Sequence, residues 1–232
     1  MASALIEEYI ESIYHMAQDG VPVIGARLME KFGVSAPTVT TTVKRMVRDG
    51  HIEVSERKEI SLTPSGQQLA ESMLRRHRLS ERLLTDFLGF EWHRVHAEAC
   101  RIEHSLSPEV EARLSQALGH PPTCPHGNPI PGNAGPAKKN TIPLIQAKIG
   151  EKVRVARISE VAEEDDELMA YLHEQGLMPG SSLTVLEKAP FNGPVSIRGD
   201  NRVVAISPEV AAKVWVLTGA DAEAEPQFDP QA

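Results

Sequence analysis

The main change in the spacing of apolar residues along this chain of 232 residues falls at a segment rich in proline. Before residue 119 the apolar side chains mostly recur every three or four residues, as in helices, whereas from residue 150 they alternate, as in strands with one buried face. Residues 119–143 contain 7 of the 17 prolines and are typical of turns that pass into a linker. We therefore expect a mainly helical part followed by a small all-β barrel.

The helical part begins with the pattern of a winged helix-turn-helix. Residues 3–18 have a helical period, and two further helices are expected at 24–32 and 33–50, where Gly33 begins the turn and Gly50 ends the second helix. Residues 51–66 then alternate into two short strands around a charged turn, which predicts the hairpin of a wing. The apolar stripe of the first helix is Leu5, Tyr9, Ile13 and Met16.

Three more helices are expected at 64–88, 91–106 and 107–119. Beyond residue 150, five alternating segments and one short helix at 166–175 predict a five-stranded barrel. The last residues, 219–232, are acidic, and we expect them to be disordered.

The net charge of −8 does not exclude a nucleic-acid partner. Residues 149–232 hold 7 basic and 15 acidic side chains, whereas residues 1–148 hold 17 of each. The expected winged helix, residues 21–63, is slightly basic, with 7 basic against 5 acidic side chains. The acidity is therefore confined to the C-terminal part, and DNA binding by the N-terminal part remains open.

We expect a cytoplasmic protein. No stretch approaches the length of about 20 apolar residues that spans a bilayer, and the N-terminus lacks the pattern of a signal peptide. The two cysteines, Cys100 and Cys124, are too few for a disulfide framework. A ligand or a buried thiol is the more natural role for each.

A row of potential metal ligands lies in the segment VHAEACRIEHSL, residues 95–106. On a continuous helix His96, Cys100, Glu103 and His104 share one face. The long helix adds a second pair one turn apart, and the first helix adds two carboxylates; these residues are His77, Glu81, Glu8 and Glu11. Mixed carboxylate, imidazole and thiolate donors suit an exchangeable transition metal, whereas a structural zinc site would need more cysteines. Taken singly, each pair is also explained as a solvated helix face or a buried thiol.

These motifs resemble the diphtheria toxin repressor family of metal-dependent transcriptional regulators. The similarity covers residues 4 to about 217 and includes HRLSERLLTDFLG, the H-x3-C-x2-E-H run, GNPIPG and the C-terminal barrel, which also resembles a ferrous-transport accessory domain. It implies a homodimer that binds palindromic operator DNA when loaded with Fe(II) or Mn(II). The implied segments are a DNA-binding winged helix-turn-helix (1–63), a helical dimerisation and metal-binding domain (64–140), a linker (141–149), an SH3-like barrel (150–218) and the acidic tail (219–232).

The resemblance also implies two metal sites. The primary site would comprise Glu8, Cys100, Glu103 and His104, and the ancillary site His77, Glu81 and His96. A further ancillary ligand would come from the barrel, at Asp165 or a neighbour in EEDDE, residues 163–167, since Leu168 at the other matching position cannot coordinate a metal. Glu11 is available as in the shorter manganese-sensing relatives. Cys124 and His126 could form another metal site, although their proline-rich turn favours a structural role.

Residue 8 bears on the choice of metal. Iron-responsive members of the family carry methionine there and manganese-responsive members aspartate, so the hard carboxylate of Glu8 favours Mn(II), while Cys100 keeps some softness suited to Fe(II). We expect Mn(II), with Fe(II) as the alternative. Co(II), Ni(II), Zn(II) and Cd(II) are expected to bind in vitro.

The second helix of the helix-turn-helix is the expected recognition helix. Pro37 and threonine methyl groups can contact thymine methyl groups, and hydroxyls can bond phosphate oxygens. Family members commonly have glutamine at the position of Thr41, which leaves the sequence specificity open. The candidate DNA contacts are Arg27, Ser35, Pro37, Thr38, Thr40, Thr41, Lys44, Arg45, Arg48, Arg57 and Lys58.

The expected function is a metal-dependent transcriptional regulator that represses metal-uptake genes. The sequence also allows two other functions. One is a winged-helix regulator that does not respond to metal. The other is a metalloenzyme, because such ligands can activate water, but the sequence has no evident general base and an enzyme leaves the helix-turn-helix unexplained. We therefore expect no enzymatic activity.

Overall fold

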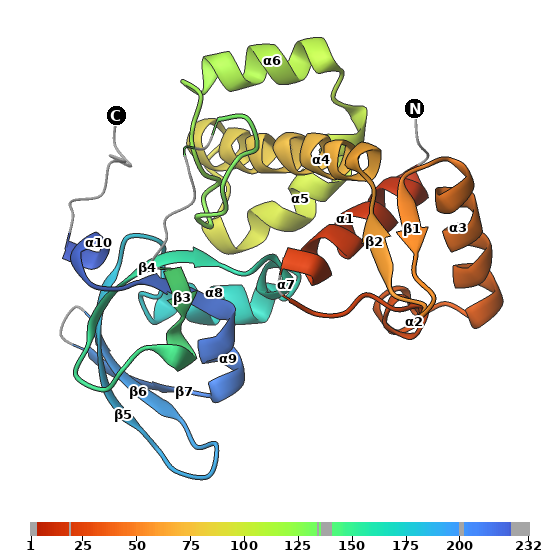
Figure 1. Ribbon diagram of the computed structural model, residues 1–232. Coiled ribbons are helices and arrows are strands. Elements are labelled where there is room, and N and C mark those ends of the chain that lie inside the picture. Colours follow the sequence, from red (N-terminus) through yellow and green to blue (C-terminus); the bar gives the residue numbers. More distant parts are fainter. Residues whose placement is uncertain (1–3, 19, 134, 136–140, 200–201, 224–232) are drawn as a thin grey trace. The chain divides into compact units, whose positions relative to one another are not determined.

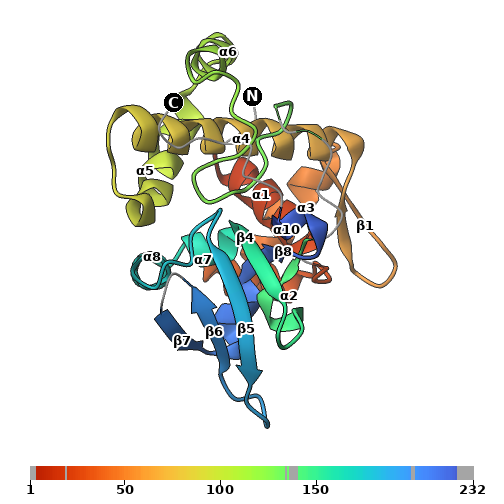
Figure 2. The ribbon, with the colours of Figure 1, turned by 90° about the vertical axis from the view of Figure 1, so that its left-hand side faces the viewer.

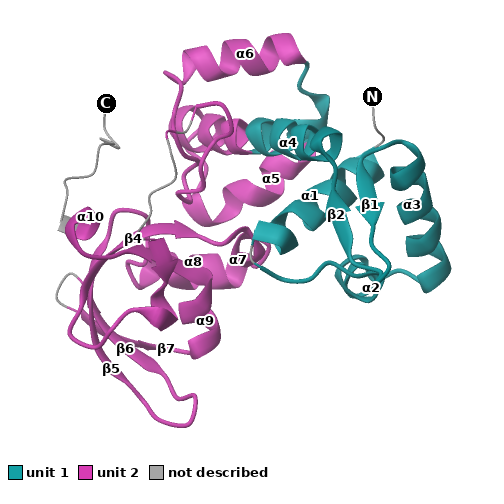
Figure 3. Cartoon of the chain, in the orientation of Figure 1, with its two compact units in different colours: residues 1–77, 102–107 teal, residues 78–101, 108–232 magenta. Residues whose placement is uncertain are grey.

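The computed structural model describes residues 4–18, 20–133, 135, 141–199 and 202–223, and it forms two compact units (Figure 3). Unit 1 lies within residues 1–77 and 102–107, and unit 2 within residues 78–101 and 108–232. The grouping differs from the expected segments, because the helical region is divided between the two units. No helix in the described part of the chain is both long and apolar enough to cross a membrane.

Unit 1 is a winged helix-turn-helix, as the sequence predicts (Figure 1). Gly33 adopts a left-handed conformation (φ 61°) that ends one helix and begins the tight turn to the next. The wing is an antiparallel pair in which Ile52 lies opposite Leu62. Its elements are α1 (Ala4–Gln18), α2 (Gly25–Phe32), α3 (Ala36–Arg48), β1 (Ile52–Val54), β2 (Ile60–Leu62) and the first part of α4 (Pro64–Arg82).

The buried face of α1 is rotated from the predicted one. Leu5 is 48% exposed, and the residues that enter the core are Ile6, Tyr9, Ile10 and Ile13. With about 100° between successive residues of a helix, this stripe puts Glu7 at its margin and Glu8 on the opposite side. Glu7 is indeed 8% exposed, whereas Glu8 is exposed. The correction matters because Glu8 is a predicted metal ligand, whereas Glu7 is not.

The helices of the middle region are less regular than predicted. The long helix changes to a π-helical turn, η1 (Leu83–Phe87), and the helix expected at 91–106 is instead η2 (Trp92–Arg94), α5 (Val95–Ile102) and η3 (Glu103–Ser105). The tighter 3₁₀ turn at Glu103 interrupts the predicted ligand row. His96 and Cys100 belong to unit 2, and Glu103 and His104 to unit 1. Helix α6 (Pro108–Ala117) follows as expected.

The C-terminal part is a small antiparallel sheet with strand order β3-β8-β4-β5-β6-β7. Its strands β4, β5, β6 and β7 can be followed in Figure 2. The prediction of five strands was one short, because β3 (Thr141–Pro143) has only three residues and lies in the expected linker. The other strands are β4 (Lys152–Ile158), β5 (Ser182–Lys188), β6 (Val195–Gly199), β7 (Arg202–Ile206) and β8 (Val214–Leu217). The intervening short helices are η4 (Leu144–Gln146), α7 (Glu160–Glu163), α8 (Asp166–Glu174) and α9 (Pro208–Lys213).

The core of this sheet contains a residue from the helical region. Trp92 of η2 is 7% exposed and belongs to the same buried cluster as Val155, Met169 and Val216. The helical residues of unit 2 and the sheet therefore share one core. After the sheet, α10 (Ala220–Glu223) occupies the beginning of the segment that we expected to be disordered, and residues 224–232 of that segment lie outside the described residues.

Candidate functional site

A chain of acidic and imidazole groups lies inside unit 1. His77 Nδ1 of α4 is 2.6 Å from Glu103 Oε2, and both side chains are 3% exposed. The other oxygen of Glu103 is 3.3 Å from His104 Nε2. His104 Nδ1 is in turn 2.9 Å from Glu7 Oε2 of α1. We call Glu7, His77, Glu103 and His104 the unit 1 cluster; it joins three elements that are far apart in sequence.

In the unit 1 cluster, the positive charge near Glu103 does not offset the cost of burying its carboxylate. Burial raises the pKa of Glu103, and the nearby carboxylate of Glu11 raises it further. His77 and His104 act in the opposite direction without cancelling the increase. A divalent cation bound here would favour the ionised form of Glu103.

The structure brings some of the predicted ligands into this cluster and leaves others out. Glu103 and His104 are together, but His77, predicted for the ancillary site, contacts Glu103. Glu8 points away from the core, and Glu7 takes the position beside His104. Glu11 is half-buried, and one of its oxygens is 3.7 Å from His15 Nε2. If Ile6 and Ile10 are counted in the apolar stripe of α1, the sequence places Glu7 at the edge of the buried face. That signal would have pointed to Glu7 as the residue beside His104.

Unit 2 contains a second convergence of ligand atoms. His126 Nδ1 is 3.1 Å from both Glu81 Oε1 and Glu163 Oε2. His96 Nδ1 is 3.4 Å from that oxygen of Glu163 and 3.8 Å from that of Glu81. One ligand atom each from Glu81, Cys124 and His126 lie within 4.8 Å of one another. These five residues, Glu81, His96, Cys124, His126 and Glu163, form the unit 2 cluster.

The turn that follows α6 fixes the orientation of the His126 ring. His126 Nε2 donates to the carbonyl of Trp92 (2.9 Å), which leaves Nδ1 to face the carboxylates. The turn itself needs glycine at residue 127, because φ is +87° and an added Cβ would lie 2.2 Å from the carbonyl oxygen of Ala156. Asn128 donates to Glu163 Oε1 (2.6 Å) and orients that carboxylate.

The charges of the unit 2 cluster are strongly coupled. Burial alone would lower the pKa of His126, but the carboxylates of Glu163 and Glu81 outweigh it and raise the pKa well above its usual value. Burial would raise the pKa of Glu163, yet His126 brings it below the usual range. Two buried carboxylates thus share one imidazolium. Oxygen, nitrogen and sulfur donors in such a place fit a divalent transition metal.

Sequence reasoning located this second cluster only in part. Glu81 and His96, both predicted for the ancillary site, lie in this cluster, and so do Cys124 and His126, for which a structural role was favoured. Asp165 is exposed, and its carboxylate accepts a hydrogen bond from the backbone nitrogen of Leu168 (3.0 Å), so it caps α8. Its neighbour Glu163 reaches the cluster instead. Cys100 is exposed, with its sulfur 3.7 Å from His96 Nε2.

The two cysteines are expected to differ sharply in reactivity. Burial and the neighbouring Glu81 raise the pKa of Cys124 to about 12, so its thiol stays protonated at neutral pH. Cys100 is exposed. We expect iodoacetamide at pH 7.5 to modify Cys100 in the folded protein and Cys124 only after denaturation, as checked by peptide mass spectrometry. The C100S variant is the control, and rapid labelling of its folded form would contradict the burial of Cys124.

Almost all the predicted DNA contacts lie on the surface of unit 1. Ser35, Pro37, Thr38, Thr40, Thr41, Lys44, Arg45, Arg48, Arg57 and Lys58 are all exposed. Arg27 is half-buried and donates to the carbonyl of Pro22. Arg48 pairs with Asp49 at 2.9 Å, and Arg45 lies 3.7 Å from the same carboxylate. Lys44, Arg57 and Lys58 are exposed cations of the kind that contact phosphate groups in protein–DNA complexes, whereas Arg45 and Arg48 lie against Asp49.

Comparison with known families accounts for nearly the whole chain. Residues 1–60 match the N-terminal DNA binding domain of the iron dependent repressors, and residues 63–132 match their metal binding and dimerisation domain. Residues 142–217 match the FeoA domain. These three domains follow one another along the chain in that order.

Individual relatives are likewise repressors of this kind. The iron-dependent repressor IdeR of Mycobacterium leprae is 38% identical over 220 residues, which cover 90% of this chain and 95% of the relative. The diphtheria toxin repressor of Corynebacterium diphtheriae is 35% identical over 218 residues, or 90% and 95% of the two chains. One similar solved structure is a manganese-dependent transcriptional repressor in complex with manganese, with a TM-score of 0.83 and 32% identity over 92% of this chain and 100% of the other. Another is ScaR with bound Zn2+, with a TM-score of 0.80 and 26% identity over 92% of this chain and 99% of the other. The chain therefore belongs to the iron-dependent repressor family, whose members are metal-dependent, DNA-binding transcriptional repressors and not enzymes.

Proposed function

We propose that this repressor binds its operator when a divalent metal, in the first place Mn(II), binds at the unit 1 cluster. The supporting observation is the contact between His104 Nδ1 and Glu7 Oε2, which are 97 residues apart in sequence. Glu7 lies on the first helix of the DNA-binding domain, and His104 lies in the stretch that matches the metal binding and dimerisation domain. A ligand held by both residues would fix α1 against the segment that carries Glu103.

Metal binding would be coupled to DNA binding through the charges of the unit 1 cluster. Glu7, Glu11 and Glu103 bring negative groups together, and burial of Glu103 makes this costly. A divalent cation, when bound, supplies the positive charge that stabilises the ionised carboxylates. The carboxylates and His104 would then hold α1 in one position, and the position of α3 on DNA would depend on it. By linkage, operator DNA must tighten metal binding by the same factor.

The donor set favours Mn(II) over softer metals. The unit 1 cluster offers only oxygen and nitrogen, and the predicted role of Glu8 would add another hard oxygen. If Cys100 is a ligand, as predicted, its sulfur would add a soft donor. Fe(II) is therefore the alternative metal, and relatives named as iron-dependent support it. Co(II), Ni(II), Zn(II) and Cd(II) should also bind in vitro, because geometry and availability rather than affinity decide the metal in the cell.

A second metal site is proposed at the unit 2 cluster. Glu81, His126 and Glu163 would be its principal ligands, with Cys124 and His96 beside them. The hydrogen bond from His126 Nε2 to a backbone carbonyl is the arrangement that fixes the ring of a metal-bound histidine. Because Glu163 belongs to α7, occupation of this site would strengthen the attachment of α7 to the end of α4.

The dimer that the family forms would need an apolar surface. Phe87 and Leu88 are 64% and 60% exposed, and Phe90 and Val110 are also exposed. All four lie in the stretch that matches the dimerisation domain, and we propose them as part of the dimer interface. A twofold dimer reads two equivalent half-sites, which implies a palindromic operator.

The proposed place of action is the cytoplasm, and the proposed regulated genes are those of metal uptake.

Fluorescence anisotropy tests the proposal. Labelled DNA from upstream of this gene and of metal-transporter genes would be titrated with protein under chelator, and then under anaerobic Mn(II) or Fe(II). We expect binding only with metal, and the ratio of the two affinities ranks the ions. Equally tight binding under chelator would remove metal from the switch and favour a winged-helix regulator of another signal.

A further inference from the structure

One tyrosine of α1 contacts both helices of the helix-turn-helix. Tyr9 is 1% exposed, and its ring stacks on that of Phe32 of α2, with the ring centroids 4.0 Å apart and the planes 2° from parallel. The hydroxyl of Tyr9 is hydrogen-bonded to the side chain of Thr42 of α3, which is also buried. Through this one side chain, α1 is attached to α2 and to the expected recognition helix α3.

The direction of the hydrogen bond between Tyr9 and Thr42 follows from the other partner of Thr42. The hydroxyl of Thr42 donates its single proton to the carbonyl of Thr38, one turn earlier in α3 (3.1 Å). Its oxygen still has lone pairs that accept, so the phenol of Tyr9 is the donor. Removal of either hydroxyl therefore leaves this polar contact between α1 and α3 unmade.

The same helix carries Glu7 on another side. Successive residues of a helix are about 100° apart, so Glu7 and Tyr9 project from nearly opposite sides of α1. Glu7 Oε2 is 2.9 Å from His104 Nδ1 on one side, and Tyr9 contacts α2 and α3 on the other. All of these residues belong to unit 1. Helix α1 therefore lies between the unit 1 cluster and the helix-turn-helix.

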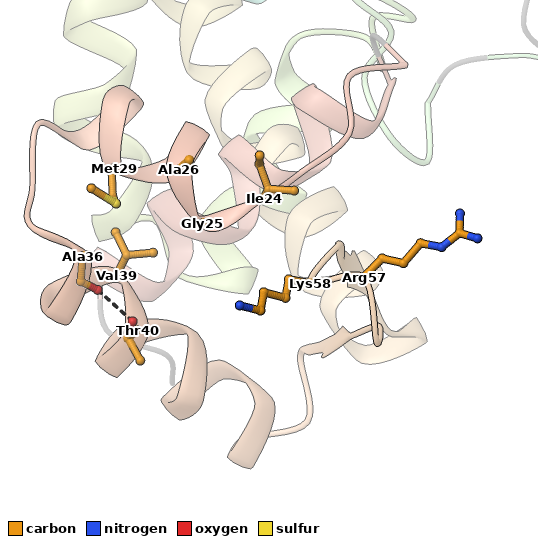
Figure 4. A pocket seen from close by; sticks show the side chains of 9 residues that line it. All are labelled: Ile24, Gly25, Ala26, Met29, Ala36, Val39, Thr40, Arg57 and Lys58. Atoms are coloured by element: carbon orange, nitrogen blue, oxygen red, sulfur yellow. Dashed lines mark hydrogen bonds between the residues drawn. The ribbon is translucent and has the colours of Figure 1, made fainter.

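The packing of α2 against α3 is incomplete. A pocket of about 420 Å³ lies between the two helices and extends to Lys58 of the wing (Figure 4). Met29 of α2 lines it, as do Val39 and Thr40 of α3. Side chains that face such a space lack packing partners there. The position of α3 consequently depends more strongly on its contacts with α1.

We propose that Tyr9 is a positioning residue of this repressor, which transmits the position of α1 to the recognition helix α3. Metal held by Glu7 and His104 would fix α1, and the hydrogen bond from Tyr9 to Thr42 would hold α3 in the orientation that binds DNA. The inference rests on the proposed function and names the contact through which metal at the unit 1 cluster acts on the DNA-binding helix.

The test uses the full chain, Mn(II) and a DNA sequence that wild type selects from a random library in the presence of metal. Y9F keeps the ring that stacks on Phe32 and lacks only the hydroxyl. Its affinity for Mn(II) without DNA, measured with a competing chelator dye, should equal that of wild type. With Mn(II) bound, its affinity for DNA should be about fivefold lower, the factor for one net hydrogen bond. By linkage, the tightening of Mn(II) binding by DNA should fall by the same factor.

Variants of Thr42 test whether the two hydroxyls act together. T42V lacks the accepting oxygen and should lose the same factor of about five, and the double variant Y9F/T42V should lose no more than either single variant. T42S keeps the hydroxyl and should keep the wild-type tightening of Mn(II) binding by DNA. Y14F is the matched control, because Tyr14 is a partly buried tyrosine of the same helix. It should bind Mn(II) and DNA as wild type does.

Circular dichroism would verify that each variant is folded, and if Y9F is not, the comparison of T42V with T42S decides. The proposal is overturned if Y9F or T42V keeps the wild-type tightening, or if their losses multiply in the double variant. It is also overturned if Y9F weakens Mn(II) binding equally with and without DNA, since Tyr9 would then support the metal site alone. Failure of Mn(II) to strengthen DNA binding by wild type would instead contradict the proposed function, and this proposal with it.

Discussion

Replacement of His104 by alanine is expected to abolish the response of DNA binding to metal. His104 lies between two carboxylates, 2.9 Å from Glu7 and 3.3 Å from Glu103, so its loss removes a nitrogen donor and leaves the carboxylates to repel each other. We expect metal affinity to fall by about 100-fold or more, since even residues that only support metal ligands cost about 10- to 100-fold. A competing chelator dye measures metal affinity, and anisotropy measures DNA binding with Mn(II).

His104 is 24% exposed, so the H104A variant should fold. Circular dichroism and sedimentation would verify its helix content and its dimer. The matched control is H93A, because His93 is 23% exposed and pairs with Glu91, which is 3.8 Å away and itself 63% exposed. H93A should respond to metal like wild type. Metal-dependent binding by H104A equal to that of H93A would show that the unit 1 cluster is not the switch.

Replacement of Arg78 by alanine is expected to destabilise unit 2 by about 3–5 kcal/mol, the cost of breaking a buried ion pair. The guanidinium of Arg78 is 6% exposed and donates through Nε to Glu160 Oε1 at 2.8 Å and through another nitrogen to the carbonyl of Pro129. Burial would lower the pKa of Arg78, but nearby acidic groups, Glu160 first among them, together outweigh it, so the guanidinium stays ionised. Without Arg78, the largely buried Glu160 loses its principal counterion.

Urea denaturation of the metal-free protein would measure this change in the free energy of unfolding. The control is R113A, which removes an exposed pair with Glu109 and should cost less than about 1 kcal/mol. The double variant R78M/E160L should recover much of the loss, because apolar replacement of both partners leaves no buried charge. If R78A and R113A have equal stability, the pair does not anchor this region.

This ion pair also bears on the unit 2 cluster. Glu160 and Glu163 both belong to α7, and Pro129 belongs to the turn that carries His126. Arg78 therefore attaches both ligand-bearing segments to α4. Arg82 adds to this by donating to the carbonyl of Thr123 (2.8 Å). We consequently expect R78A to weaken metal binding in unit 2 even though Arg78 is not a proposed ligand.

Short-range sequence patterns were enough to predict the main elements of the fold. The helical period, the turn glycines and the alternating segments predicted the winged helix-turn-helix and the small antiparallel sheet, because period and turn chemistry are properties of neighbouring residues. The family was recognisable from the run around Cys100 and from GNPIPG, and the metal-dependent repressor function is confirmed by the relatives. The identities of the ligands stay predictions and proposals.

The tertiary structure alone decided which donors meet. Glu7 replaces Glu8 beside His104 because the core of unit 1 takes Ile6 and Ile10, which turns α1. Glu163 replaces Asp165 because Asp165 caps α8, while Asn128 and His126 hold Glu163. His126 itself depends on a turn that packs against β4 and Trp92. The sequence by itself indicated most of the helices and strands and the kinds of donor atom they carry; contacts between distant segments decided which donors lie together, because donors converge only where packing brings their segments within a few ångströms of one another.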